Sequence, residues 1–268
     1  MSAGAVLLTS GGAALLGLSG YGLWSSLRRA QVVGTPVLRY RLVGPPRPGS
    51  PLNEIRVPMS VFEAQVRHLA RRGHTAVTIS EAAERRKDKA FLAKSPIAFV
   101  FEGPYQSFVE FAWPALRESG FGAATLLFPP KALGQVQLRF RRGRPEPILE
   151  TETLARLARE GVELGLHAAG LDPQSDEEIQ SDLIAGRAAL SAISGQQLKT
   201  AAVPFSTPKA LRALKRAGFS VIASTGDGIL ERGLRGDPVT VPCFPMQPDT
   251  SLLDMVLVVS RRIEGAVW

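Results

Sequence analysis

The stretch that decides the fold is Ser95-Pro-Ile-Ala-Phe-Val-Phe-Glu-Gly-Pro-Tyr105. Its core, Ile97 to Phe101, carries no charge and is rich in β-branched and aromatic side chains. Such runs are typical of strands that are buried on both faces of a parallel sheet. The sequence Glu102-Gly103-Pro104 follows at once and places a polar turn at the end of this strand. Because sites in α/β folds form at the carboxyl ends of strands, this turn is the first candidate for a functional site.

On both sides of this stretch the sequence alternates predicted strands and helices. Upstream we expect a strand at 35–43, a helix from the capping box Ser60-Val-Phe-Glu63 to Gly73, a strand at 75–79 and a charged helix at 81–92. Downstream we expect helices at 107–119, 151–160, 175–195 and 208–217, strands at 122–128, 162–166, 200–203 and 219–224, and two last elements at 239–241 and 252–259. Repeated strand-then-helix units imply parallel strands with right-handed crossovers, and therefore a barrel or a doubly wound sheet.

Composition narrows the classes of protein. The chain of 268 residues carries a net charge of +8, but no basic run alternates with exposed aromatic residues, so we expect no nucleic acid partner. The basic balance instead fits the anionic headgroups of a membrane lipid surface. The single cysteine, Cys243, excludes an intramolecular disulfide and any metal site built from several thiolates. Residues 131–147 form a basic excursion in which Val136, Leu138 and Phe140 alternate with polar residues, as in a small hairpin.

The N-terminal segment is predicted to be a transmembrane helix. Residues 3–24 contain no charged side chain and, as a helix, are long enough for a hydrocarbon core of ~30 Å. No positively charged segment precedes them, which favours an uncleaved anchor over a signal peptide. We therefore expect residues 1–30 to be an anchor with its basic flank, and residues 31–268 to be the main domain.

Two features of this segment bear on partners and orientation. One face of the predicted helix carries the small side chains of Ala5, Thr9, Ala13 and Gly17. Such a face would let a second membrane helix approach closely. The alternative is that the pattern arises by chance in a glycine-rich span. The nearest basic residues all follow the span, which places the main domain in the cytoplasm of a single-pass membrane protein: Arg28, Arg29, Arg39 and Arg41.

The order of several segments carries a family resemblance. These are Val37-Leu-Arg-Tyr-Arg41, Phe62–Ser80, Val100-Phe-Glu-Gly-Pro-Tyr105, Val162-Glu-Leu-Gly-Leu-His167 and Ala202-Val-Pro-Phe-Ser206. In order and spacing they resemble the polysaccharide deacetylases, the metal-dependent carbohydrate esterases with a nodulation-protein-type fold. The resemblance runs from about residue 37 to residue 229 and implies a distorted (β/α)7-type barrel.

The departures from the family pattern fall on its chemistry. That chemistry needs one Asp and two His to hold a divalent cation, and a second Asp as base for the attacking water. The resemblance implies that Glu102 stands at the position of the base, Gly103 at that of the metal-binding Asp, and Leu171 at that of the second His, while His167 retains the first. The late catalytic His falls near Ser260. Since a catalytic zinc needs about three protein ligands, we expect no metal, no cofactor and no catalysis.

Alternatives for these residues remain open. Asp172 could join Glu102 and His167 as a metal ligand, although it precedes Pro173 and is typical of a turn before a helix. Without a metal, Glu102 is expected to be a rim carboxylate bonded to backbone N–H groups, and His167 a partnered imidazole at the end of a strand.

The sequence therefore predicts a membrane-anchored, catalytically inactive deacetylase-like protein that acts as a scaffold or accessory subunit of a membrane-associated assembly. Its expected contacts with membrane-protein partners are the N-terminal helix and the 131–147 excursion. One alternative is a divergent metal-dependent deacetylase or glycan hydrolase. Another is a glycan-binding module of the cell envelope, with Tyr105 and Phe205 as stacking platforms. Family members that act on envelope glycans work outside the cytoplasm, so an extracytoplasmic domain is the alternative orientation.

Overall fold

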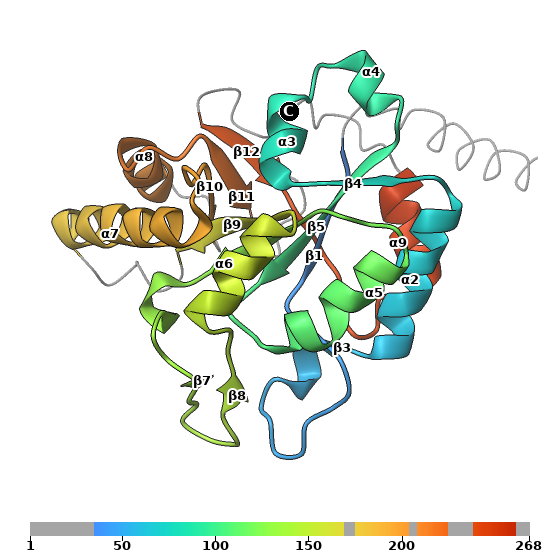
Figure 1. Ribbon diagram of the computed structural model, residues 1–268, viewed down its shortest axis with the longest axis horizontal. Coiled ribbons are helices and arrows are strands. Elements are labelled where there is room, and N and C mark those ends of the chain that lie inside the picture. Colours follow the sequence, from blue (N-terminus) through green and yellow to red (C-terminus); the bar gives the residue numbers. More distant parts are fainter. Residues whose placement is uncertain (1–34, 169–174, 204–207, 225–237, 261–268) are drawn as a thin grey trace, which may run out of the picture.

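The computed structural model describes residues 35–168, 175–203, 208–224 and 238–260 (Figure 1). Its main sheet consists of β1 (Val37–Tyr40), β4 (Thr75–Val77), β5 (Pro96–Glu102), β6 (Ala124–Phe128), β9 (Val162–His167), β10 (Thr200–Val203), β11 (Val221–Ser224), β12 (Val239–Pro242) and β13 (Phe244–Pro245). The strand order is β12-β11-β10-β9-β6-β5-β1-β13, with β4 paired to β5, and every pairing is parallel. Strand β5, which lies within residues 95–105, is an interior strand between β6 and β1.

The last two strands close this sheet on itself. Strands β12 and β13 are consecutive segments separated only by Cys243. The first pairs with β11, and the second pairs with β1 through Leu38 and Phe244. The sheet is therefore a nearly closed barrel of parallel strands, as the family resemblance implied.

Side-chain alternation divides the core into two layers. Successive residues of a strand point to opposite faces. Small apolar side chains form one buried cluster, which fills the barrel: Val37, Ala98, Val100, Ala202, Ala223 and Val241. Their larger neighbours form the second cluster, under the outer helices: Leu38, Tyr40, Phe99, Phe101, Leu126, Phe128 and Leu166. Arg39, Glu102 and His167 share the alternation of the inner set, which places polar side chains at the carboxyl end of the barrel.

Helices cover the outside of the barrel. They are α2 (Met59–Arg71), α5 (Trp113–Glu118), α6 (Thr151–Arg159), α7 (Asp176–Ser194), α8 (Pro208–Arg216) and α9 (Leu252–Ser260), and a π-helical turn at Phe108–Ala112 precedes α5. In Figure 1, α2, α5 and α9 lie on one side of the strands, while α6, α7 and α8 lie on the other. Helix α7 begins with the predicted capping box, in which Ser175 and Glu178 each accept a hydrogen bond from the other's backbone N–H. The last predicted element, at 252–259, is the helix α9.

Two predicted helices differ in their bounds. The capping box at Ser60 is wrong, because α2 begins at Met59 and its N-cap is Pro58, which makes no side-chain cap. Ser60 thus lies inside the first turn, and Glu63 accepts a hydrogen bond from Arg67 instead. The fixed φ of proline already suits the start of a helix, so no hydroxyl is needed there.

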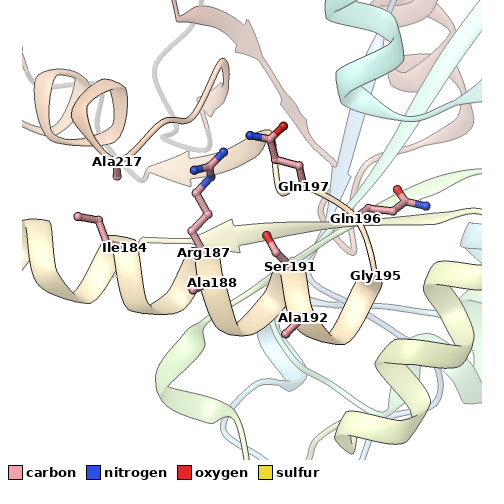
Figure 2. Close-up of a pocket in the computed structure, with 9 residues that line it drawn as sticks. All are labelled: Ile184, Arg187, Ala188, Ser191, Ala192, Gly195, Gln196, Gln197 and Ala217. Atoms are coloured by element: carbon pink, nitrogen blue, oxygen red, sulfur yellow. The ribbon is translucent and has the colours of Figure 1, made fainter.

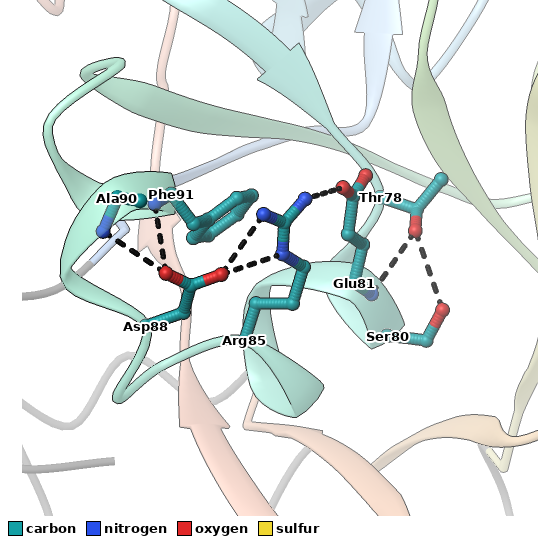
Figure 3. Close-up of polar contacts among 7 residues, drawn as sticks. All are labelled: Thr78, Ser80, Glu81, Arg85, Asp88, Ala90 and Phe91. Carbon is teal, nitrogen blue, oxygen red and sulfur yellow. Dashed lines mark hydrogen bonds and ion pairs between the residues drawn. The ribbon is translucent and has the colours of Figure 1, made fainter.

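The helix expected at 81–92 is two short helices, α3 (Ile79–Glu84) and α4 (Lys89–Leu92) (Figure 3). Thr78 caps the first, and the carboxylate of Asp88 accepts the backbone N–H groups of Ala90 and Phe91 at the start of the second. The break follows because an aspartate that bonds to nearby backbone groups favours a cap over a helix interior. Helix α3 closes the amino-terminal end of the barrel, since its Ile79 and Ala82 belong to the inner cluster.

Two excursions lie at the opposite end, at the carboxyl ends of the strands (Figure 1). The predicted hairpin is present, because β7 (Gln137–Leu138) pairs antiparallel with β8 (Glu146–Pro147). The strand expected at 35–43 breaks at Arg41, and its second part, β2 (Leu42–Val43), pairs with β3 (Arg56–Val57) in a separate small sheet. A backbone hydrogen bond of 2.7 Å from Arg144 to Gly49 joins the two excursions.

The expected transmembrane helix at 3–24, with its face of Ala5, Thr9, Ala13 and Gly17, lies outside the described residues. Within the ranges that the structure describes, no helix combines the length and the apolar character that a membrane span requires.

Candidate functional site

The carboxyl ends of the strands bring a buried ion cluster together. Arg39 lies on β1, Glu102 is the last residue of β5, and His167 is the last residue of β9. The register places Arg39 beside Val100, two residues before Glu102 and on the same face. Arg41, just after β1, reaches the same carboxylate from the rim. We call Arg39, Arg41, Glu102 and His167 the Glu102 cluster.

Glu102 is the acceptor at its centre. Oε2 accepts a hydrogen bond of 2.5 Å from Nη1 of Arg39, and Oε1 lies 2.8 Å from Nε2 of His167. Arg41 adds longer contacts of 3.3 Å to Oε2 and 3.4 Å to Oε1. Both carboxylate oxygens are therefore engaged by side chains, where the sequence led us to expect backbone N–H groups.

The cluster keeps Glu102 ionised. Burial by itself would raise the pKa of this carboxyl, but the hydrogen bond with His167 and the positive charges of His167, Arg39 and Arg41 outweigh burial and lower the pKa to about 2. A carboxylate with so low a pKa holds its neighbours strongly and accepts a proton poorly.

Sequence reasoning missed the two arginines. It counted Arg39 and Arg41 as part of a basic flank, but the side chain of Arg39 is only 3% exposed inside the barrel. The available signal was the position of Arg39 within an apolar strand, two residues from Val37, which indicates a buried charge that needs a partner. Two of the four arginines from which a cytoplasmic domain was predicted, Arg39 and Arg41, therefore bind Glu102 at the end of the barrel.

Gly103 follows the cluster in a conformation that favours glycine. Its φ is +115°, and a Cβ at this position would overlap the ring of Tyr105. Tyr105 itself is held by a bridge to Ile148, next to the hairpin. The position that the resemblance assigns to the metal-binding Asp is therefore closed by an aromatic ring.

These residues do not fit a divalent cation. The oxygens of Glu102 are taken by guanidinium and imidazole groups, and Gly103 offers no ligand and no room for one. In the part of the chain that the structure describes, no three His, Cys, Asp or Glu side chains gather as a metal site requires. Leu171, Asp172 and Phe205 lie outside the described residues, and Ser260 is the last residue of α9.

A second ion cluster lies under the hairpin. The buried carboxylate of Glu146 accepts hydrogen bonds from Nη2 of Arg56, at 2.5 Å, and from the hydroxyl of Ser50. Arg47 lies 3.7 Å from its second oxygen. We call Arg47, Ser50, Arg56 and Glu146 the Glu146 cluster, which fastens the hairpin to the loop between β2 and β3.

A surface hollow of about 530 Å³ lies elsewhere (Figure 2). It runs along α7 from Ile184 to Gly195, and the chain continues from there into the start of β10. The hollow therefore lies toward the amino-terminal ends of the strands. Its charged residue, Arg187, donates to the backbone carbonyl of Leu198 and stacks over the ring of Phe219. This arrangement supports the packing of α7 and offers no reactive group.

Comparison with known proteins places this geometry in context. No protein-family model matches the sequence, and no curated protein matches it. Among solved structures, the Streptococcus pyogenes deacetylase PplD, in complex with acetate, shares 15% identity over 85% of this chain and 99% of its own, with a TM-score of 0.71. A polysaccharide deacetylase from Bacillus cereus shares 18% identity over 84% of this chain and 69% of its own, with a TM-score of 0.68. IcaB from Ammonifex degensii shares 20% identity over 86% of this chain and 98% of its own, with a TM-score of 0.66.

The structural similarity establishes the fold, whereas identities this low leave the activity open. The nearly closed parallel barrel, its outer helices and its similarity to these structures over 84–86% of the chain lead to one conclusion. The chain has the fold of the polysaccharide deacetylases.

Proposed function

We propose that this protein is a membrane-anchored, catalytically inactive relative of the polysaccharide deacetylases that acts as a scaffold or accessory subunit of a membrane-associated assembly. The observation that carries the proposal is the saturation of Glu102 by Arg39, Arg41 and His167.

Two physical arguments support the loss of catalysis. A cation at Glu102 would have to displace Arg39, whose guanidinium already neutralises the carboxylate at 2.5 Å. Without a metal, Glu102 would have to serve as a general base, for which a pKa near the working pH is best. Its pKa of about 2, set by burial and by the opposing effects of His167 and the two arginines, leaves it a weak base.

The scaffold role draws on the excursion at 131–147. The Glu146 cluster anchors its base, while its tip exposes four guanidinium groups: Arg139, Arg141, Arg142 and Arg144. Val136 is 69% exposed beside them. An apolar residue within a cationic rim suits a protein partner with an acidic surface. The membrane anchor in this proposal is the segment at 3–24, on the strength of its sequence.

Catalysis is tested on the full chain in mild detergent. Zinc content is measured in protein purified without chelator, and acetate release from N-acetylglucosamine oligomers is measured with and without added Zn²⁺. We expect no stoichiometric zinc and no acetate release above that of Glu102→Gln. Zinc-dependent release that disappears in Glu102→Gln and in His167→Ala would contradict the proposal.

The scaffold role is tested by purification from native membranes. Replacing the four arginines of the hairpin tip by Gln should remove the proteins that co-purify with the wild type. A matched control replaces four exposed arginines, namely Arg67 and Arg71 on α2, Arg72 at the C-cap of α2 and Arg159 on α6, and should retain the co-purifying proteins. An isolated monomer without co-purifying protein, or equal loss in both variants, would count against this role.

A further inference from the structure

The two ion clusters share one design. In each, a buried carboxylate is paired at 2.5 Å with a buried arginine, Arg39 for Glu102 and Arg56 for Glu146. Each carboxylate also has a second, more distant arginine whose side chain is about half exposed. Arg41 is 46% exposed at 3.3 Å from Glu102, and Arg47 is 45% exposed at 3.7 Å from Glu146.

In each cluster, the buried arginine already neutralises the carboxylate, so the second arginine is not required for this purpose. Among the described residues, the four guanidinium groups of the two clusters face two carboxylates, so guanidinium charges outnumber carboxylate charges by two. The buried arginines make the shorter contacts, which leaves the surplus on Arg41 and Arg47. A guanidinium has five N–H donors, and Arg41 directs only its Nε and one Nη to Glu102. Further donors of a half-exposed guanidinium are open to a ligand.

Tyr105 links the two clusters on one rim. Its ring covers Gly103 beside Glu102, and its backbone bridges Ile148, two residues after Glu146. Burial raises the pKa of Tyr105 to about 12, and charges of both clusters act on its phenol, with Arg41 lowering the pKa and Glu102 and Glu146 raising it. The partly exposed ring of Tyr105 thus lies within electrostatic reach of both clusters.

We propose that this rim binds a saccharide that carries carboxylates, with Arg41 and Arg47 as its anion-recognising residues and Tyr105 as a ring against which a sugar packs. The planar fork of a guanidinium matches a carboxylate through two parallel hydrogen bonds. A partly exposed aromatic ring within reach of two clusters that carry half-exposed arginines suits a ligand that alternates apolar ring faces with anionic groups. The site lies at the carboxyl ends of the strands, where barrels of this kind form ligand sites. The inference rests on the proposed non-catalytic role and names a ligand class for it.

The test compares probes of matched size with the full chain in mild detergent. Calorimetric titration with a short oligogalacturonate should give saturable binding, whereas a neutral N-acetylglucosamine oligomer of equal length should bind at least about tenfold more weakly, since hydrogen bonds between charged groups are the stronger ones. A glutamate oligopeptide with the same number of carboxylates separates saccharide recognition from simple charge attraction and should also bind more weakly.

Variants assign the binding to the rim. Arg41→Gln and Arg47→Gln should each weaken oligogalacturonate binding by about tenfold. Arg41→Lys, which keeps the charge and loses the fork, should bind with intermediate affinity. The matched control is Arg67→Gln on α2, where an arginine of similar exposure faces Glu63, and its affinity should equal that of the wild type.

Several results would overturn the inference. These are equal binding of the neutral oligomer, equal or tighter binding of the glutamate peptide, or equal weakening by Arg67→Gln. Acetate release is measured in the same samples, so the two proposals fail separately. Absence of binding without acetate release overturns only the ligand, whereas zinc-dependent release overturns the non-catalytic role.

Discussion

Glu102 is the residue on which the interpretation of this barrel depends. A buried carboxylate is stable only when partners offset the cost of removing it from water, and here Arg39 and His167 supply close contacts while Arg41 adds a third. Such clusters cost desolvation energy, so they stabilise a fold less than their short distances suggest. Their clearest physical signature is a dependence of stability on pH.

The pH dependence has a definite sign. The pKa of Glu102 is about 2 in the folded protein against an ordinary value of 4.5, because its cationic partners outweigh burial. Its stabilising contribution is therefore complete above pH ~4.5 and is lost as pH falls toward ~2. We expect the difference in free energy of unfolding between wild type and Glu102→Gln to shrink by roughly 3 kcal/mol over this range. Urea unfolding at several pH values measures it.

Glu118→Gln, an exposed substitution on α5, corrects this comparison for general acid destabilisation. A difference between wild type and Glu102→Gln that stays constant with pH would contradict the low pKa.

Gly103 offers a second test at the residue scale. Gly103→Ala should destabilise the fold by about 1–2 kcal/mol for its φ of +115°, and by about 1–3 kcal/mol more for the overlap with Tyr105. Gly73→Ala is the matched control, since Gly73 has a φ of +75° and nothing within 4 Å of an added Cβ. Denaturant unfolding should show the cost of this overlap at Gly103 and not at Gly73. In a Tyr105→Ala background, Gly103→Ala should cost only the amount due to its φ, because the ring that it would overlap is gone.

At the scale of elements, a buried ion pair and the backbone hydrogen bond from Arg144 to Gly49 hold the hairpin of β7 and β8 in place. Strands of two residues cannot hold an excursion of this length in place by themselves. Glu146 and Arg56 supply the buried ionic part of the attachment, and both side chains are 2% exposed. The position of the exposed arginine tip therefore depends on a carboxylate at the base of the hairpin.

Removing that carboxylate should loosen the hairpin. Glu146→Gln leaves Arg56 buried without a countercharge, which we expect to cost about 3–5 kcal/mol. Limited trypsin digestion should then cut faster after the arginines of the tip, as identified by mass spectrometry. Arg47→Gln is the control, because its half-exposed contact is worth about 0–1 kcal/mol and its loss leaves Arg56 and Glu146 paired. Equal digestion of both variants would refute this attachment.

For the whole molecule, the barrel closes at one place, between β12 and β13, which we call the seam. Cys243 separates β12 from β13, which pair with opposite ends of the sheet order, and its thiol is buried. Burial raises the pKa of this thiol to about 12, with smaller effects from Arg39 and Glu102. The only thiol of the chain thus reports on whether the seam is closed.

We expect Cys243 to react with Ellman's reagent very slowly in the folded protein and promptly in concentrated urea, because the thiolate is the reactive form and the seam excludes the reagent. The reaction rate at low urea should follow the opening of the barrel. Cys243→Ser, which removes the thiol, gives the background rate. Prompt stoichiometric reaction without denaturant would show that the seam is open.

Local sequence signals predicted most elements because they act over a few residues. The apolar run at β5, the capping box of α7 and the alternation in the hairpin each depend on neighbours close in the chain. The signals failed where two nearby residues could each begin a helix. Pro58, and not Ser60, is the N-cap of α2. Asp88 caps a new helix, which divides one expected helix into two.

The sequence by itself determined the parallel α/β class, because periodicity and the spacing of turns dictate which segments become strands. These signals left a barrel and a doubly wound sheet open, and the family resemblance implied the barrel. It also identified Glu102 and His167 at strand ends and showed that Gly103 lacks a ligand. Only the tertiary structure decided what holds Glu102. Its partner Arg39 is 63 residues away in the chain and meets it solely through the register of β1 with β5. Charge pairing inside a barrel depends on which strands become neighbours, and that information lies in no single stretch of sequence.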